Sequence, residues 1–162
     1  MRFPFFLLSL FTLLTSCATD ESSGFAPLDL TSYNIPVTIQ APDSAEVQSQ
    51  SLSGLIDDVT IRSPADRYAV QVLASDAQTS DMARLKSEQL ELVRDNRYFA
   101  RVVEEEAQGF IFENKIDTTS AYGFRYIVYR GDREIVFQNS FDGVFSLAEV
   151  RDMYTSVKPV QE

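Results

Sequence analysis

The chain has 162 residues, a length that suits about one folded domain. With 44% hydrophobic and 23% charged residues it has the composition of a folded protein, and its net charge of −10 argues against a surface for nucleic acid, which needs clustered positive charge. A single Cys and the absence of His exclude His-based catalytic triads, His-bound haem, His or multi-Cys metal sites and internal disulfides, so no cofactor and no metal is predicted.

Residues 1–16 have the pattern of an export signal. Arg2 precedes an apolar run from Phe3 to Leu14. As a helix this run would span about 18 Å, which is short of the roughly 30 Å hydrocarbon core of a bilayer. The run therefore predicts a cleaved signal peptide rather than a membrane-spanning helix.

The tetrapeptide Leu14-Thr15-Ser16-Cys17 follows this apolar run directly. It resembles the lipobox of bacterial lipoproteins, which places a Leu three residues before, and a small residue directly before, a lipidated Cys. The resemblance covers residues 1–17 and implies diacylglycerol on the Cys17 sulfur, cleavage before Cys17 and a stable membrane anchor. An ordinary secreted protein with a spare thiol at Cys17 is the alternative.

Two features after Cys17 bear on location within the envelope. Ala18 stands where many Gram-negative lipoproteins carry an Asp that retains them in the inner membrane, so the resemblance implies the outer membrane rather than the inner one. Asp20-Glu21 resembles the short acidic signal that some Bacteroidota lipoproteins use to reach the cell surface, and is equally typical of a solvated tether. The periplasmic side and the cell surface both stay open.

Residues 17–32 are mostly small and polar and are interrupted by Gly24 and Pro27, which is typical of a flexible tether. Docking of Phe25, Leu28 and Leu30 on the edge of the domain would order part of this tether. We expect a single folded domain over residues 33–158. In its first half, hydrophobic alternation predicts strands at 33–40, 45–49, 57–62 and 67–74, with a loop at 50–56.

Residues 79–95 have the clearest helical periodicity, with Thr79 or Ser80 as the predicted cap. The predicted apolar face consists of Met82, Leu85, Leu92 and Val93, with Leu90 at its margin. Four β-rich runs joined mostly by short turns then predict an antiparallel meander, at 98–105, 109–116, 122–130 and 133–140.

A second helix is predicted at 146–157, because Ser146 and Glu149 have the spacing of a capping box. The predicted fold class is therefore α+β, a mostly antiparallel β-sheet with two α-helices at about 79–95 and 146–157. We expect both helices to pack on one face of the sheet and the other face to stay partly wet.

Acidic residues offer the one carboxylate-rich candidate for catalysis, formed by Glu104, Glu106, Glu113 and Asp117. A hydrolase of the glycosidase type could use two carboxylates about 5–10 Å apart. Acidic residues in a row at a hairpin corner are more often simply solvated. The sequence therefore predicts no enzyme, with a carboxylate-based envelope hydrolase as an alternative.

A binding surface is predicted on the strand at 122–130. Arg125, Ile127 and Tyr129 alternate to one face and mix charge, aliphatic and aromatic groups, which suits a binding surface. A solvent face of no use, or the core of a second layer, would explain the same pattern.

These observations predict a lipid-anchored bacterial envelope lipoprotein with a small acidic, non-enzymatic domain that binds a protein or another envelope ligand. Its expected partners are the membrane, through the lipid on Cys17, and an envelope protein; no nucleic acid is expected. A structural subunit of an envelope complex, with no ligand of its own, is a further alternative.

Overall fold

The computed structural model describes residues 24–141 and 143–158, so the predicted signal peptide, the lipobox and Cys17 lie outside the described residues. Two α-helices are present, α1 (Met82–Arg94) and α2 (Leu147–Ser156). The strands are β1 (Phe25–Asp29), β2 (Thr38–Pro42), β3 (Glu46–Leu52), β4 (Ile56–Ser63), β5 (Tyr68–Asp76), β6 (Phe99–Glu105), β7 (Gly109–Ile116), β8 (Thr119–Arg130) and β9 (Arg133–Asn139).

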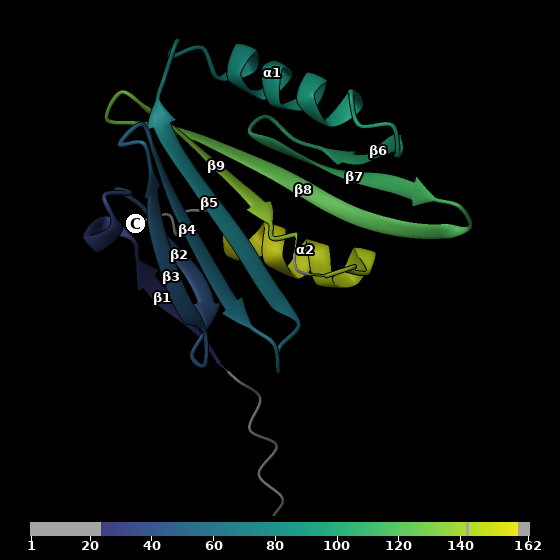
Figure 1. The fold of residues 1–162 in the computed structure, drawn as a ribbon, viewed down its shortest axis with the longest axis horizontal. Helices are drawn as coiled ribbons and strands as arrows, with labels where there is room; N and C mark the ends of the chain where they lie inside the picture. The colour runs from purple at the N-terminus through teal and green to yellow at the C-terminus, as the bar shows by residue number, and fades with distance from the viewer. Residues whose placement is uncertain (1–23, 142, 159–162) are drawn as a thin grey trace, which may run out of the picture.

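Strands β3 to β9 form one seven-stranded sheet in the order β3-β4-β5-β9-β8-β7-β6, with every neighbouring pair antiparallel (Figure 1). The sheet consists of two consecutive meanders, which are joined where β5 pairs with β9, opposing Val72 to Phe137. Helix α1 connects the two meanders in the chain. The predicted α+β class, with a mostly antiparallel sheet and two helices, is confirmed.

The folded region begins earlier than predicted. Residues 25–29 form β1, which pairs with β2 in a separate two-stranded sheet around the short 3₁₀ helix η1 (Thr31–Tyr33). Leu30 is fully buried in the main core beside Ile39. The tether predicted over 17–32 is therefore too long. Its C-terminal part folds onto the domain because removing apolar side chains such as Leu30 from water is favourable.

Turn chemistry explains the hairpins of the sheet. Gly131 and Asp132, the turn between β8 and β9, both have φ of 61°, as a two-residue turn of the primed type requires. Ser53 and Gly54 likewise have positive φ between β3 and β4. Strand β3 extends through Leu52, so the loop predicted at 50–56 is shorter than expected.

The two helices lie on opposite faces of the sheet, on either side of β8 (Figure 1). Helix α2 packs Met153 and Tyr154 against Phe124 and related side chains of the main core. Helix α1 packs Leu85 against Ile127, which points to the other face of the same strand.

The prediction that both helices pack on one face is therefore wrong. Strand β8 buries apolar side chains on both sides, Phe124, Tyr126 and Val128 on one and Ile127 on the other, so each side needs its own cover. The predicted helix face was also imprecise, because Leu92 is 66% exposed while Leu90 is buried. The cap of α1 is Asp81, whose carboxylate accepts from the backbone N–H of Ala83 at 3.0 Å.

Part of the face that carries α1 stays open and polar over β9, β5, β4 and β3. Gln138 donates to the Gln71 amide oxygen at 2.7 Å, and Gln71 donates to Asp58 at 3.0 Å. Gln50 donates to the same carboxylate at 2.9 Å. These bonds give the buried Asp58 carboxylate hydrogen-bond donors, which explains how the sheet tolerates it there.

Candidate functional site

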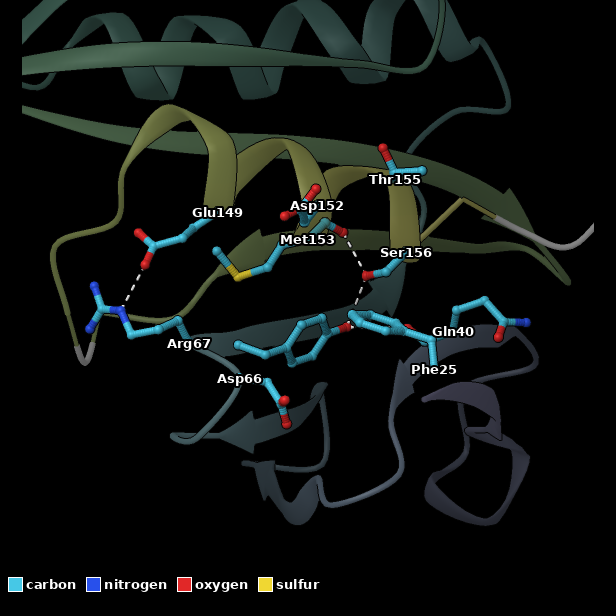
Figure 2. Close-up of a pocket in the computed structure, with 10 residues that line it drawn as sticks. Phe25, Gln40, Asp66, Arg67, Glu149, Asp152, Met153, Thr155 and Ser156 are labelled. Atoms are coloured by element: carbon cyan, nitrogen blue, oxygen red, sulfur yellow. Dashed lines mark hydrogen bonds and ion pairs between the residues drawn. The ribbon is translucent and has the colours of Figure 1, made fainter. Parts of the chain in front are cut away.

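A cavity of about 450 Å³ lies between α2, the start of β5 and the β1–β2 hairpin (Figure 2). This volume is in the usual range of small-ligand sites. It gathers segments far apart in the chain and is lined by Phe25, Gln40, Asp66, Arg67, Tyr68, Glu149, Asp152, Met153, Thr155 and Ser156.

Aromatic and sulfur-containing side chains form the apolar part of this cavity. Phe25 meets Tyr68 edge to face with ring centres 5.8 Å apart, and Met153 is almost fully buried beside them. The Tyr68 hydroxyl lies 3.1 Å from the Ser156 hydroxyl and donates to the Gln40 carbonyl at 3.3 Å. Burial raises the pKa of Tyr68 to about 12, so its hydroxyl stays protonated and neutral at physiological pH.

Charged groups form the rim of the cavity. Arg67 donates to Glu149 at 2.7 Å and to the Val144 carbonyl at 3.0 Å (Figure 2). Glu149 also completes the capping box of α2, accepting from the Ser146 backbone N–H at 2.7 Å while Ser146 accepts from Glu149. The predicted capping box is thus confirmed. The Glu149 carboxylate both caps the N-terminus of α2 and holds Arg67 at the rim of the cavity.

The Glu149 carboxylate should control acid stability at this site. Its hydrogen bond from Arg67, with those from Ser146, lowers its pKa from 4.5 to about 2. As the pH falls, Glu149 is therefore protonated in the unfolded chain before it is protonated in the folded one. The stability that the ionised carboxylate contributes is complete above about pH 4.5 and is lost as the pH falls toward about 2. Denaturant unfolding of Glu149→Ala should show a loss of stability at pH 7 that shrinks toward pH 2.

Removing its partner gives the matched control. Arg67→Met should show a smaller loss with the same direction of pH dependence, because the Ser146 bonds to Glu149 persist. A difference between wild type and Glu149→Ala that stays constant from pH 7 to pH 2 would contradict this assignment.

The predicted binding face is not open at its centre. Ile127 is fully buried under Leu85 of α1, so the prediction that it offers an exposed contact is wrong in this fold. Tyr129 lies partly buried beside the same cluster and donates to Asp132 at 2.7 Å. Arg125 shares their face but lies at the other edge of α1, where it borders two further hollows.

The carboxylates of the predicted hydrolase are held in separate ion pairs. Glu104 pairs with Arg151 at 2.5 Å and Glu106 with Lys158 at 2.8 Å. The bond from Lys158 is the main cause of the lowered pKa of Glu106.

Glu113 lies on β7 and is held by neighbours from its own end of the sheet. It accepts from Ser120 at 2.6 Å and from Arg101 at 2.7 Å, and these bonds, Ser120 first, lower its pKa. Asp117 lies in the turn after β7 with φ of 54°. The structure therefore divides the four predicted acidic residues among different ion pairs and a turn.

The described residues hold neither a metal-binding cluster nor a membrane-spanning helix. Across residues 24–141 and 143–158 no group of three or more His, Cys, Asp or Glu side chains is arranged to hold a metal ion. Within the same ranges neither α1 nor α2 has the length and hydrophobicity needed to cross a bilayer.

The fold defines a small α+β domain with a mainly apolar cavity whose rim is charged. No family model, no curated protein and no solved structure matches this chain.

Sequence reasoning missed this cavity because its residues come from four separate segments. Phe25 lies in the predicted tether, and Met153 lies in the helix predicted at 146–157, with nothing in the sequence to connect them. The one available signal was the capping-box residue Glu149, whose second bond to Arg67 cannot be read from the sequence.

Proposed function

We propose that this chain is a lipid-anchored envelope lipoprotein whose folded domain binds a small ligand. The observation that carries the anchoring is the pattern Leu14-Thr15-Ser16-Cys17 behind an apolar run. Seven residues separate Cys17 from the first strand residue, Phe25, and an extended segment of this length spans at most about 25 Å. The domain is thus held close to the leaflet that carries the lipid.

The anchoring places the cavity near the membrane surface, because Phe25 is both the start of β1 and a wall of the cavity. After cleavage before Cys17 the chain would have 13 basic and 24 acidic residues, a net charge of −11. An anionic leaflet repels such a domain, so the tether keeps it beside the membrane rather than adsorbed on it.

The chemistry of the cavity indicates the class of ligand. Its lining is mainly apolar, and its rim carries the carboxylates of Asp66, Glu149 and Asp152 with one guanidinium, Arg67, already paired. A neutral or singly cationic molecule with an apolar body suits this arrangement, because the three carboxylates outnumber the one guanidinium at the rim and would repel an additional anion.

The state of the acidic residues supports a binding role over hydrolysis. A general acid in glycoside hydrolysis needs a raised pKa. Here Glu106 and Glu113 have lowered pKa values because basic or hydroxyl groups hydrogen-bond their ionised forms. Such carboxylates are stabilised as anions and are poor proton donors.

The test is to identify what the full-length protein carries when it is purified from envelopes. Solvent extraction and mass spectrometry should find one neutral or cationic small molecule in near-stoichiometric amount. Phe25→Ala, which removes a wall of the cavity, should reduce its occupancy about tenfold.

Leu52→Ala is the matched control, because Leu52 is 45% exposed and Phe25 is 48% exposed, but Leu52 lies on β3 away from the cavity. It should leave the occupancy unchanged. An equal loss in both variants, or no enriched molecule, would contradict the ligand-binding role. A single stoichiometric protein partner with no small molecule would favour the structural-subunit alternative.

A further inference from the structure

We infer that a second site, on the α1 face of the sheet, binds a monoanionic carboxylate with an apolar body through Arg125. This site is independent of the anchoring and of the cavity at α2. It is a hollow of about 360 Å³ between the C-terminal end of α1, strands β7 and β8, and the loop after β9. Its lining includes Leu92, Phe112, Asn114, Arg125, Phe141 and Val144.

Arg125 has no carboxylate partner among the ion pairs of the described residues. Its guanidinium donates to the carbonyl of Phe124 at 3.0 Å and lies 5.8 Å from the centre of the Phe112 ring. The residue as a whole is partly exposed, but its guanidinium is removed from water far enough that burial lowers its pKa to about 10. A desolvated cation without a counter-ion is costly, and an anion entering the hollow would compensate it.

A second polar group in the same hollow lacks a partner. The amide oxygen of Asn114 is buried and accepts no hydrogen bond, although most buried polar atoms are satisfied. Phe112 and Asn114 are two positions apart on β7, so their side chains lie on the same face, and Arg125 of β8 lies on that face too. An amide oxygen cannot donate to a carboxylate, so Asn114 borders the site and the anion is held by the guanidinium of Arg125.

The floor has the shape that this arrangement needs. A Cβ on Gly123 would come within 2.6 Å of the Phe112 ring, so only glycine lets that ring lie across β8 at this point. The ring in turn supports the guanidinium of Arg125 from one side. Arg125 and Phe112 both line the hollow.

The walls determine what the rest of the ligand must be. Leu92, Phe141 and Val144 are 66%, 86% and 58% exposed at this hollow, which is unusual for large apolar side chains that cluster. They suit an aliphatic or aromatic body attached to the anion. A dianion is disfavoured, because Arg125 is the one cation among the described residues that line the hollow and the C-terminal end of α1 contributes partial negative charge.

The test uses 4-tert-butylbenzoate and its neutral amide as probes. Each is titrated against the full mature protein held in neutral-lipid nanodiscs, with empty nanodiscs as the blank. The wild type should bind the carboxylate saturably and about ten- to hundredfold more tightly than the amide, which is the usual effect of one hydrogen-bonded charge pair.

Variants separate this site from a structural role of Arg125. Arg125→Gln should lose the preference for the carboxylate, and Arg125→Lys should keep part of it. Arg130→Gln, at the exposed end of the same strand, should bind like the wild type. Asn114→Asp should abolish binding, because a second carboxylate then competes with the probe.

Thermal unfolding provides a readout that does not depend on the probes. Arg125→Gln should fold and be at least as heat-stable as the wild type in the absence of ligand, because it removes an uncompensated buried charge. Marked destabilisation of Arg125→Gln, equal binding of carboxylate and amide, or no saturable binding of the carboxylate would each overturn the proposal.

Discussion

Replacing Ile127 by alanine is expected to lower the free energy of unfolding by about 2–5 kcal/mol, as for other fully buried aliphatic side chains. Ile127 is fully buried and packs with Leu85 of α1 and Val136 of β9. The truncation would leave a cavity that the helix and sheet cannot fill without moving apart. Urea unfolding followed by far-ultraviolet circular dichroism measures this loss directly.

The control is Leu92→Ala on α1, the helix that covers Ile127. Leu92 is 66% exposed, so its truncation should change the free energy of unfolding by no more than about 0.5 kcal/mol. If Ile127→Ala also costs less than about 0.5 kcal/mol, then α1 does not cover this face and the open binding face predicted from the sequence returns.

Replacing Cys17 by alanine is expected to abolish lipid attachment. Two or three acyl chains bind a membrane far more strongly than one, so the wild type should sediment almost entirely with membranes. Cys17→Ala should incorporate no labelled palmitate and should lose that lipid-dependent membrane attachment. Metabolic labelling with palmitate followed by fractionation gives both results.

Ser16→Ala is the matched control for Cys17→Ala, because it keeps a small residue directly before the Cys. It should be labelled and anchored like the wild type. Equal palmitate incorporation in Cys17→Ala and the wild type would contradict the assignment of Cys17 as the lipidated residue.

The sheet could be predicted well because its signals are local. Tyr68, Val70 and Val72 alternate with smaller or polar residues, and β5 occupies Tyr68–Asp76 where a strand at 67–74 was expected. The Gly131-Asp132 turn depends on two consecutive residues with positive φ, which this dipeptide adopts at low cost. Ser146 and Glu149 form the expected capping box because this motif too depends on residues only three positions apart.

The placement of the helices could not be predicted, because it depends on long-range packing. Strand β8 is apolar on both faces, with Phe124 and Tyr126 on one side and Ile127 on the other. The periodicity of a helix shows which of its own faces is apolar, but it does not show which face of the sheet that helix covers.

The cavity at α2 and the hollow beside Arg125 could not be predicted from the sequence either, because both depend on long-range packing. Arg67 and Glu149 are 82 positions apart in the chain, and only the fold brings them to one rim. Arg125 was singled out from the sequence as part of an open face. Its significance in the structure is different, because it is a desolvated cation without a carboxylate partner beside exposed apolar side chains.

The intact mass of the mature protein from its own envelope tests the central claim, lipid anchoring through Cys17, most directly. The account predicts a chain that begins at Cys17 and carries the additional mass of a diacylglycerol group on that residue. A mature chain that begins at another residue, or that begins at Cys17 with an unmodified thiol, would contradict it.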